Sequence, residues 1–591
     1  MRSPTVATLV LGLALLCQFI TSGYEMLTMK RSMVTISMNK VWPFSNPTET
    51  YRYYDLPFCQ PEVIGTHWMS FGQILRGDRL VNSIYKFQFG IDLPKTQVCQ
   101  KTFTKEELEV LKAAVKDSYM FEMFVSLSYT SLFSLRYFLL NYFEFIMGYN
   151  NDAVVSVNIT ADLDLQHLIE ITDVDAATRK LDVPFYYSVK WVESPITKSE
   201  ALEMQLKAAL MSGSDQPIEI HILAIINSFV LVMLILSLLL LVIIRVVRSD
   251  LSRYLAIPDD ELAAIEEETG WKLLYADVFR PPAHRLLLSA AVGAGTQLLL
   301  AVVLVVMVGC IGLYYRRGAV MTAGIISYLI TAASGGYVSA RLYNSLGGEK
   351  WAWNIFVTAI AFMGPTFAIW TFLNTVAIAY NSTAAWPLAT ILFIITIWAC
   401  VTFPLTVIGG IVGRHKSMKK KTEAGGNLFP CKTNKLAREI PSCHWYQSST
   451  CQMLAAGFLP FSAIYIELHY VFNSVWGPKL YTFYGILLLA SLLVFLVAAA
   501  VTVLFTYLHL NVEDHRWWWR SFISGGSVSA FFYVYCCYYY IQTSMTGLLQ
   551  VSFYFLYSLI IAYAIFLMLG TASFLATYYF VWYIYSRIKV D

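Results

Sequence analysis

Two ionisable side chains inside an apolar segment are the clearest candidates for chemistry in this chain. Glu467 and His469 lie in the run IYIELHYVF, shortly after Pro460. A charge inside the hydrocarbon of a bilayer costs a few kcal/mol, so it normally faces other helices or water and often marks a functional path. Either the two residues line a polar path, or they make structural hydrogen bonds between helices. Because residues two apart point to different faces of a helix, we expect His469 to contact another helix rather than Glu467.

Patterns for catalysis or metal binding do not stand out elsewhere in the sequence. The chain contains no HExxH, P-loop or nucleophile motif, and no GxGxxG in a strand–helix–strand context. A zinc site usually needs a closely spaced cysteine pair, which is lacking among Cys431, Cys443, Cys451, His415 and His444. We therefore expect a protein that is not an enzyme and that holds no metal and no other cofactor.

Two cysteines and two asparagines are candidates for covalent modification, because we expect them outside the cytosol. Cys59 and Cys99 are the two cysteines of the mature non-cytosolic domain. An oxidising compartment favours a disulfide between them, and two free thiols are the alternative. The sequon NIT makes Asn158 the expected glycosylation site, whereas NST at Asn381 lies against a membrane span and is a poorer acceptor.

The last residues, YSRIKVD, form a short charged tail. Lys589, Asp591 and the terminal carboxylate lie close together, which suits capture by a protein groove with pockets of both signs. One alternative is that Arg587 and Lys589 only set the orientation in the membrane. Another is a tyrosine sorting signal from Tyr585 to Ile588, although Tyr585 is expected to lie too near the membrane for an adaptor to reach it.

The composition indicates that these residues belong to a polytopic membrane protein. Hydrophobic residues make up 57% of the 591 residues and charged residues 14%, whereas soluble domains average about 25% charged residues. The mean hydropathy is +0.56, and the net charge of +3 gives no reason to expect a nucleic-acid partner. Residues 1–23 combine Arg2, an apolar run and small residues, which indicates a signal peptide, with an uncleaved first helix as the alternative.

Residues 24–220 are expected to form a β-rich domain outside the cytosol. Stretches such as MVTISMNKV and YYSVKWVES alternate apolar and polar residues between prolines, as strands and turns do. One stretch, TKEELEVLKAAVKDSY, has helical periodicity instead, and Thr104 and Glu107 have the spacing of a capping box. We therefore expect one helix within this domain.

Residues 221–584 are expected to form a domain of nine transmembrane helices. Each apolar run is long enough to cross about 30 Å of hydrocarbon, and the runs lie at 221–244, 286–313, 318–340, 353–379, 387–412, 453–474, 482–508, 521–541 and 552–584. The fold class is thus a polytopic α-helical membrane protein with an N-terminal β-rich non-cytosolic domain.

The orientation follows from the positive charges in the connecting segments. Those expected in the cytosol hold six, two, eight, two and two Lys and Arg residues, against three in the opposite loops; they are 245–285, 341–351, 413–450, 509–520 and 585–591. Positive loops stay in the cytosol, so the tail 585–591 is expected there.

Three shorter patterns concern how the helices sit in the membrane. The basic stretch GRHKSMKKK in the loop 413–450 is interpreted as part of the orientation signal, with binding to lipid headgroups as the alternative. Small residues in AAVGAGTQ and TAASGGYVSA are expected to let helices approach closely. The run RWWWR at 516–520 is interpreted as an aromatic belt at the membrane interface.

Several motifs together resemble the nonaspanins, the transmembrane 9 superfamily. The stretch MNKVWPFSNPTETYRYYDLPFC is similar to the family pattern VNKVGPYxNPxETYxYYxLPxC, apart from Trp42-Pro43-Phe44. Further matches are Gly77 to Tyr85, YSVKW, GWKLLYADVFRPP, GGEKWAWN, FPLTVIGGI, GFLPFSAIYIELHY and EDHRWWWRSF. The resemblance runs from about Met38 to Asp591, with a divergent stretch around 126–145. Within the family, AREIP, WGPKLYTFYGIL and FLMLGTASF are most like member 1.

The resemblance implies a cellular location and a role. Family members reside in Golgi and endosomal membranes and help to move other membrane proteins, including cargo with glycine-rich transmembrane helices. They are also linked to adhesion, phagocytosis and autophagy, and thus to lysosomes and autophagosomes. The tail with Lys589 and Asp591 is similar to the family's Lys-x-Asp/Glu signal, which implies binding to the COPI coat and retention in the Golgi.

Two functional hypotheses from different classes remain. The first is a trafficking factor of Golgi and endosomal membranes whose partners are the lipid bilayer, membrane-protein cargo and the COPI coat, with no nucleic acid. The second is a transporter or channel with a polar path at the sixth span. A transporter usually shows several intramembrane charges and repeated halves, and here only the sixth span carries such charges, so we favour the first hypothesis.

Overall fold

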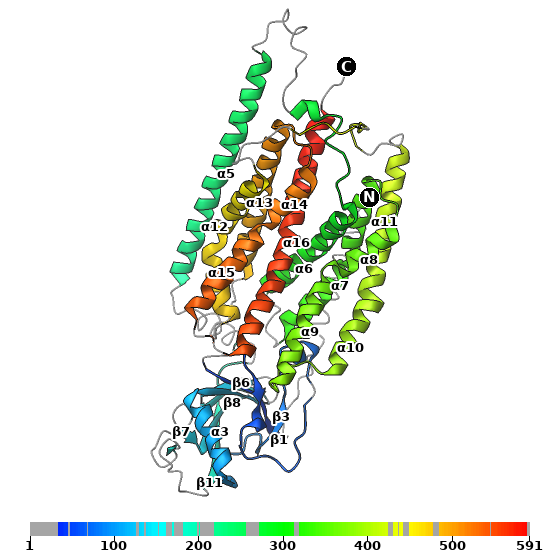
Figure 1. Ribbon diagram of the computed structural model, residues 1–591. Coiled ribbons are helices and arrows are strands. Elements are labelled where there is room, and N and C mark those ends of the chain that lie inside the picture. Colours follow the sequence, from blue (N-terminus) through cyan, green and yellow to red (C-terminus); the bar gives the residue numbers. More distant parts are fainter. Residues whose placement is uncertain are drawn as a thin grey trace, which may run out of the picture.

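The computed structural model describes residues 33–587 with several internal gaps. The residues outside the described part are 1–32, 45–47, 68, 126–128, 135–137, 152, 161–167, 171–180, 198–199, 201–217, 256–270, 312–317, 424–428, 435, 441–447, 477–483, 544, 546 and 588–591. The expected signal peptide and the tail residues Lys589 and Asp591 therefore lie outside the described residues. The described chain has a β-rich N-terminal part below a bundle of long helices (Figure 1).

The first sheet of the β-rich part is built around one long strand. β1 (Met33–Pro43) pairs antiparallel with three strands, and β6 extends the sheet in the order β2-β1-β5-β6, with β3 also on β1. The three partners of β1 are β2 (Tyr51–Arg52), β3 (Val81–Gln88) and β5 (Tyr119–Val125), and β6 (Tyr129–Ser134) pairs with β5. β1 is buried along most of its length, as expected for a central strand.

The second sheet has the order β4-β11-β8-β9. Its strands are β4 (Leu93–Phe103), β8 (Tyr142–Asn150), β9 (Ala153–Thr160) and β11 (Leu181–Glu193), while β7 (Phe138–Leu140) and β10 (Leu168–Glu170) pair separately. Only β8 and β11 run parallel among these pairs. Apolar side chains of both sheets share one core, which includes Ile36, Phe121, Phe145 and Val183.

The β-rich part also contains the helices η1 (Tyr53–Asp55), α2 (Phe71–Leu75) and α3 (Lys105–Lys116). The helix expected from periodicity is confirmed as α3. The Thr104 side chain accepts a hydrogen bond from the backbone of Glu107, and the Glu107 carboxylate accepts one from the backbone of Thr104. Its buried residues, among them Leu108 and Leu111, pack into the shared core.

The bundle is built from helices of very different lengths. They are α5 (Ile218–Leu255), α6 (Arg285–Cys310), α7 (Ala319–Ser345), α8 (Trp351–Ala361), α9 (Met363–Ala379), α10 (Leu388–Ile397), the π-helical turn η3 (Trp398–Thr402), α11 (Phe403–Glu423), α12 (Ser449–Val475), α13 (Tyr484–Asn511), α14 (Trp517–Gly526), α15 (Val528–Gln542) and α16 (Leu548–Ser586). A short helix, η2 (Trp271–Leu274), precedes α6.

Seven helices among the described residues are long and apolar enough to cross a membrane. This confirms the fold class of a multi-pass helical membrane protein with a β-rich N-terminal part. The first expected span corresponds to α5, whose apolar stretch Ile226–Val242 is shorter, and the eighth to the pair α14 and α15. Nine crossings therefore stay a prediction.

Small residues let the central helices touch through their backbones, as their clusters in the sequence predict. A Cβ atom added to Gly336 or Gly409 would collide with the backbone of α11 or α7, respectively. Gly293 of α6 faces α7 in the same way, and Gln297 donates to the carbonyl of Tyr328 at 3.0 Å. These contacts leave no room for a larger side chain at the glycines.

The bundle has two distinct ends (Figure 1). We call the end that touches the β-rich part the docked end, and the opposite end, where α16 finishes, the distal end. The described parts of the basic connecting segments lie at the distal end.

Candidate functional site

The β-rich part is fastened to the bundle by a set of hydrogen bonds, which we call the latch. It joins Thr50, Leu75 and Arg79 to the connection 382–386 between α9 and α10. Thr50 receives three bonds: the Thr383 backbone N–H and the Ser382 hydroxyl donate to its carbonyl at 2.9 and 2.8 Å, and the Thr383 hydroxyl donates to its hydroxyl at 2.7 Å.

Two longer side chains extend the latch on either side of Thr50. The Arg79 guanidinium donates to the carbonyl of Ala385 at 2.7 Å. In the other direction, the Trp386 indole N–H donates to the carbonyl of Leu75 at 3.2 Å. Burial lowers the pKa of Arg79, the nearby charge of Arg52 lowers it further, and Asp78 opposes both. Because the guanidinium group is very strongly basic, Arg79 remains positively charged in the interface despite the lowered pKa.

A buried polar network behind the latch holds Arg79 in place. The Asn39 amide donates to Asp78 at 3.1 Å and to Glu122 at 2.8 Å, while its oxygen accepts the Arg79 backbone N–H at 2.7 Å. Lys40 forms an ion pair with Asp78 at 3.2 Å. Asn39, Asp78 and Glu122 are almost completely buried, so these bonds are made away from water, where losing one is costly.

Backbone contact adds to the latch where α2 meets α7. Gly72 of α2 lies against Gly318, the residue before α7, so closely that a Cβ on either would collide with the backbone of the other. Gly318 also has a positive φ of 77°, which favours glycine. The two glycines therefore set how closely the β-rich part can approach the bundle.

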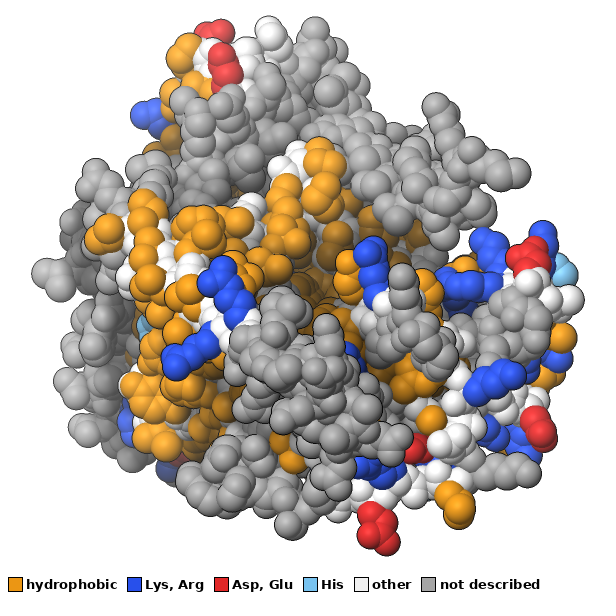
Figure 2. Space-filling model, turned by 90° about the horizontal axis from the view of Figure 1, so that it is seen from above, with side chains coloured by type: hydrophobic (Ala, Val, Ile, Leu, Met, Phe, Trp, Pro, Cys, Tyr) orange, Lys and Arg blue, Asp and Glu red, His pale blue; other side chains and the backbone are white. Residues whose placement is uncertain are grey.

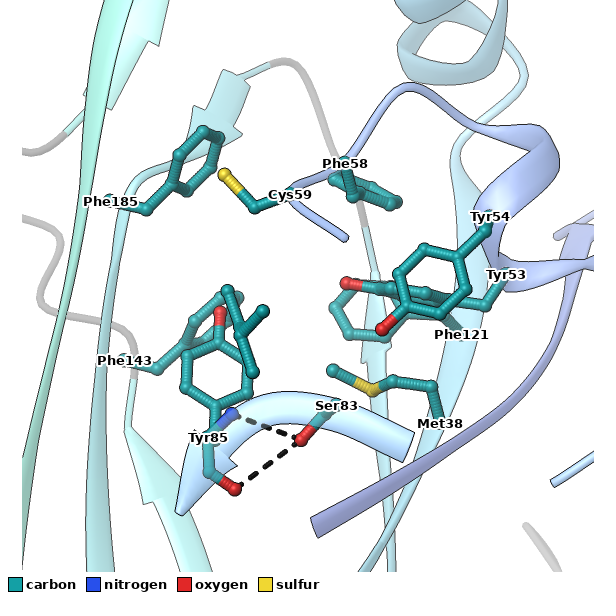
Figure 3. A pocket seen from close by; sticks show the side chains of 11 residues that line it. Met38, Tyr53, Tyr54, Phe58, Cys59, Ser83, Tyr85, Phe121, Phe143 and Phe185 are labelled. Carbon is teal, nitrogen blue, oxygen red and sulfur yellow. Dashed lines mark hydrogen bonds between the residues drawn. The ribbon is translucent and has the colours of Figure 1, made fainter. Parts of the chain in front are cut away.

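A disulfide and an aromatic pocket lie inside the β-rich part. Cys59 and Cys99 are bonded, with their Cα atoms 6.6 Å apart. Beside Cys59, the rings of Tyr53, Tyr54 and Phe121 face those of Tyr85, Phe143 and Phe185 across a narrow space (Figure 3). This space has room for about one water molecule, so it offers no site for a larger ligand.

The expected glycosylation site lies on an outer strand of the second sheet. Asn158 is exposed on β9, where it pairs with Ile146 of β8. The second sequon places Asn381 beside the latch, and the two residues that follow it, Ser382 and Thr383, are buried there. Asn381 itself is exposed, as Asn158 is.

The two intramembrane ionisable residues point in different directions on α12. Glu467 is buried, with 6% of its surface exposed. His469 is exposed, and its Nδ1 lies 3.1 Å from the hydroxyl of Tyr535 on α15. The structure therefore does not bring the two side chains together on one face. It brings His469 instead to a cluster of α15 aromatics that includes Tyr535 and Tyr539.

At the distal end, a set of aromatic side chains that we call the clamp packs around the end of α16: Trp271, Phe279, Trp517, Trp518 and Tyr585. Trp271 and Phe279 contact Tyr585 in the last turn of α16, whereas Trp517 and Trp518 contact Phe574 and Tyr578 on earlier turns. The Tyr585 hydroxyl donates to the carbonyl of Trp271 at 2.6 Å, and its ring meets the Trp271 ring edge-on. The Trp517 indole donates to the carbonyl of Val278 at 2.8 Å. Trp517, Trp518 and Tyr585 are nearly fully buried.

Ion pairs surround the clamp and tie loops to it. Asp514 binds Arg520 at 2.6 Å and Arg516 at 3.2 Å. Although burial alone would raise the pKa of Asp514, its hydrogen bonds to Arg516 and the charge of Arg520 lower it. Arg280 binds Asp277 at 2.6 Å and donates to the carbonyls of Asn434 and Leu436.

The free thiol and the imidazole next to the clamp are not activated groups. Burial raises the pKa of Cys431 to about 11, which keeps the thiol protonated and unreactive. Burial lowers the pKa of His515, although Asp277 and Asp514 oppose the effect, so the ring is neutral. The described residues contain no group of three His, Cys, Asp or Glu side chains placed to hold a metal ion.

The clamp corrects one interpretation of the sequence. The run RWWWR was interpreted as an interfacial belt, but Trp517 and Trp518 are core residues with 1% and 2% exposure. Only Trp519 is partly exposed, and its indole donates to the carbonyl of Ala283. Three consecutive tryptophans look interfacial in isolation, because the sequence does not show that Val278 meets Trp517 or that Phe429 and Phe574 pack against Trp518.

Sequence reasoning also missed the residues of the latch and its network. Asn39 and Asp78 lie within the motifs quoted for the family resemblance, and Asp277 and Trp517 lie within two further ones. In the alternating stretch MVTISMNKV, Asn39 shares a face with Thr35 and Ser37, so the pattern predicts a polar face, whereas the structure buries Asn39 completely. Such a residue needs a partner, but the sequence does not identify one at a distance of 39 or 83 positions.

Comparisons with known proteins agree with this architecture. The family model described as "Endomembrane protein 70" matches residues 50–548. The chain is 44% identical to "Putative phagocytic receptor 1b" of Dictyostelium discoideum and 41% identical to "Transmembrane 9 superfamily member 4" of Arabidopsis thaliana, each over 94% of both chains. It is 37% identical to "Transmembrane 9 superfamily member 1" of Bos taurus, over 94% of this chain and 93% of the relative. No solved structure matches. The chain therefore belongs to the Endomembrane protein 70 family, the transmembrane 9 superfamily of multi-pass membrane proteins.

Proposed function

We propose that this protein is a trafficking factor of Golgi and endosomal membranes that helps to sort and localise other membrane proteins. In this proposal the β-rich domain lies in the lumen and nine helices cross the bilayer. The tail with Lys589 and Asp591 lies in the cytosol, where it binds the COPI coat. Because the family resemblance implies it, we also propose that the cargo includes proteins with glycine-rich transmembrane helices. On the same ground we propose a link to adhesion and autophagy.

The observation that carries the proposal is the clamp around the end of α16. Because Tyr585 is buried and its hydroxyl is bonded to Trp271, α16 is anchored at its last turn. A signal formed by Lys589 and Asp591, two and four residues after Arg587, would then be tethered to an anchored helix end. Burial of Tyr585 also argues against the tyrosine sorting signal, because an adaptor must grasp that side chain.

The latch supports the proposal from the other end of the molecule. A receptor for cargo needs a lumenal part whose position is fixed relative to the helices that pass beside the cargo. The hydrogen bonds that Thr383 donates to Thr50 and that Arg79 donates to Ala385 supply that fixed position. The relative named as a phagocytic receptor is compatible with such an arrangement.

The decisive test alters the tail without touching the clamp. The variant Lys589→Ala with Asp591→Ala should leave folding unchanged and move the protein to later compartments, because the coat no longer returns it. Arg587→Gln is the matched control, since it removes one positive charge and leaves the tail signal intact. Imaging reports location, and a tail peptide pull-down reports coat binding. An unchanged location together with undiminished coat binding contradicts the proposal.

Cargo binding has its own test in intact cells. Proximity labelling should compare the full chain with a chain that lacks the β-rich domain. We expect membrane proteins with glycine-rich helices to be enriched by the full chain and reduced without the domain. Equal labelling of such proteins by both chains would show that the domain contributes nothing to cargo selection.

A transporter or channel is the second candidate, favoured by buried Glu467 near the histidine that contacts Tyr535. Under this hypothesis, reconstituted protein should carry an ion or solute across vesicles. Glu467→Gln should abolish that flux while the abundance and location of the protein stay normal. Absence of any flux, combined with loss of cargo transport in the same variant, would favour the trafficking role.

A further inference from the structure

Helix α11 continues beyond the apolar part of the bundle and ends in a cationic extension, Arg414 to Glu423. It contains Arg414, Lys416, Lys419, Lys420 and Lys421, and Glu423 is its one acidic residue. All four lysines are exposed. Lys419 and Glu423 lie 3.9 Å apart, with about two thirds of each side chain in solvent, so this pair is weak. The extension keeps most of its positive charge available.

Packing against α7 fixes which face of the extension turns outward. A Cβ on Gly413 would collide with the backbone of Tyr337, and Ser417 is buried one turn further on. Residues three and four apart share a helix face, so Gly413 and Ser417 define the inner face. Lys419, two residues after Ser417, points away from this face, whereas Lys416 extends over the ring of Tyr337 on α7 and stays exposed. The helix presents its charges as a rigid surface and not as a flexible tail.

Aromatic rings mark the depth at which the extension leaves the membrane. The Arg414 guanidinium lies 4.7 Å from the centre of the Trp351 ring, and the Lys416 amino group lies 5.4 Å from that of Tyr337. Trp353, two residues after Trp351, is 61% exposed. Tryptophan rings concentrate at the level of lipid headgroups, and these cation–π contacts hold both cations at that level.

The remaining lysines lie within electrostatic reach of the same headgroups. Lys419 to Lys421 are about 8–10 Å further along the helix axis than Arg414, which is close to the Debye length of about 8 Å at physiological ionic strength. Seen from the distal end, Lys and Arg side chains gather on the side of the molecule where Figure 1 places α11 (Figure 2). On the neighbouring helix α7, Arg341 is also exposed.

We propose that the cationic extension of α11 binds the phosphorylated headgroups of anionic lipids in the leaflet at the distal end. A cluster of basic residues directly beside a membrane span attracts such lipids. Here two cations are held at headgroup depth and three more stand above them, which suits a headgroup carrying more than one phosphate. An orientation signal alone needs positive charge but neither the rigid outward face nor the cations fixed on aromatic rings.

The test uses the purified full chain in detergent micelles. Phosphatidylinositol bisphosphate and phosphatidylcholine are added together, and native mass spectrometry counts the molecules of each lipid retained per chain. The triple variant Lys419→Gln, Lys420→Gln and Lys421→Gln removes three charges from exposed positions. The matched control replaces the same lysines with arginine and keeps the charge. Thermal melting verifies that both variants fold like the parent chain.

We expect the glutamine variant to lose about tenfold in retained phosphoinositide, while the arginine variant and phosphatidylcholine retention match the parent. Equal retention by the glutamine variant would overturn the proposal and leave the extension as an orientation signal only. An equal loss in the arginine variant would also overturn it, because charge would not be the cause. Displacement of the lipid by soluble inositol phosphate at equal concentration would assign the site to a free phosphate ligand instead.

Discussion

The latch at the docked end and the clamp at the distal end hold the molecule together by different means. The latch joins two separately folded parts through hydroxyl, carbonyl and guanidinium groups around Thr50 and Arg79. The clamp is continuous with the apolar core of the bundle and is made of tryptophan, phenylalanine and tyrosine rings. We therefore expect the clamp to be lost only when the bundle unfolds, and we expect the latch to open without unfolding either part.

The largest expected effect comes from the centre of the clamp. Trp517→Ala should lower the free energy of unfolding by about 3–5 kcal/mol, because it empties a buried site and removes the bond to the Val278 carbonyl. Trp353→Ala is the control, since that ring is 61% exposed. Thermal melting of the purified protein measures both. Similar melting temperatures for the two variants would show that the clamp is not part of the core.

The disulfide should have the next largest effect, confined to the β-rich domain. Replacing Cys59 and Cys99 with serine should cost this domain about 2–4 kcal/mol, because the unfolded chain is no longer restricted. Protease sensitivity of the domain measures the loss, and Cys310→Ser on the bundle should leave it unchanged. Peptide mapping under non-reducing conditions that finds both thiols free would contradict the pairing.

The third largest effect on stability is expected from the buried polar network behind the latch. Asp78→Asn should cost about 1.5–3 kcal/mol, because Lys40 and Asn39 lose a charged acceptor away from water. The domain should become more sensitive to protease while the melting of the bundle is retained. Asp182→Asn, at an exposed position on β11, is the matched control. Equal protease sensitivity of the two variants would argue that the network does not support the domain.

These two ends also show what the sequence could and could not predict. Periodicity identified the β-rich part, α3 and the apolar helices, because these depend on neighbours within a few positions. Both sites depend instead on contacts between distant positions, such as Trp271 with Tyr585 and Thr50 with Thr383. The motifs that carry the resemblance contain many of these residues, but a motif gives residue types and not the partner that each one meets.

A smaller effect is expected from removing a single bond of the clamp. Tyr585→Phe keeps the ring in place but leaves the buried carbonyl of Trp271 without the hydroxyl, which should cost about 1–2 kcal/mol. Hydrogen exchange should rise in the last turn of α16 and in η2. Tyr583→Phe, on an exposed ring two residues earlier, should change neither. Unaltered exchange in both variants would mean that the hydroxyl does not anchor the helix.

The smallest effect should come from the latch, and it separates the two ends most clearly. Thr50→Val preserves the shape of the side chain but removes the hydroxyl that meets Thr383 at 2.7 Å, which should cost about 0.5–1 kcal/mol. Thr50→Ser retains the hydroxyl and serves as the control. Because the carbonyl of Thr50 keeps its two other bonds, the global melting temperature should hardly move.

The informative measurement for Thr50→Val is therefore local hydrogen exchange. If the latch opens independently, exchange should increase in the connection 382–386, while exchange in the clamp and in the core of the β-rich domain stays at the parent level. The reason is that a contact between two folded parts can break without exposing either core. Exchange that rises equally in the latch, the clamp and the domain core would show that the molecule opens as one cooperative unit, and the distinction between its two ends would then fail.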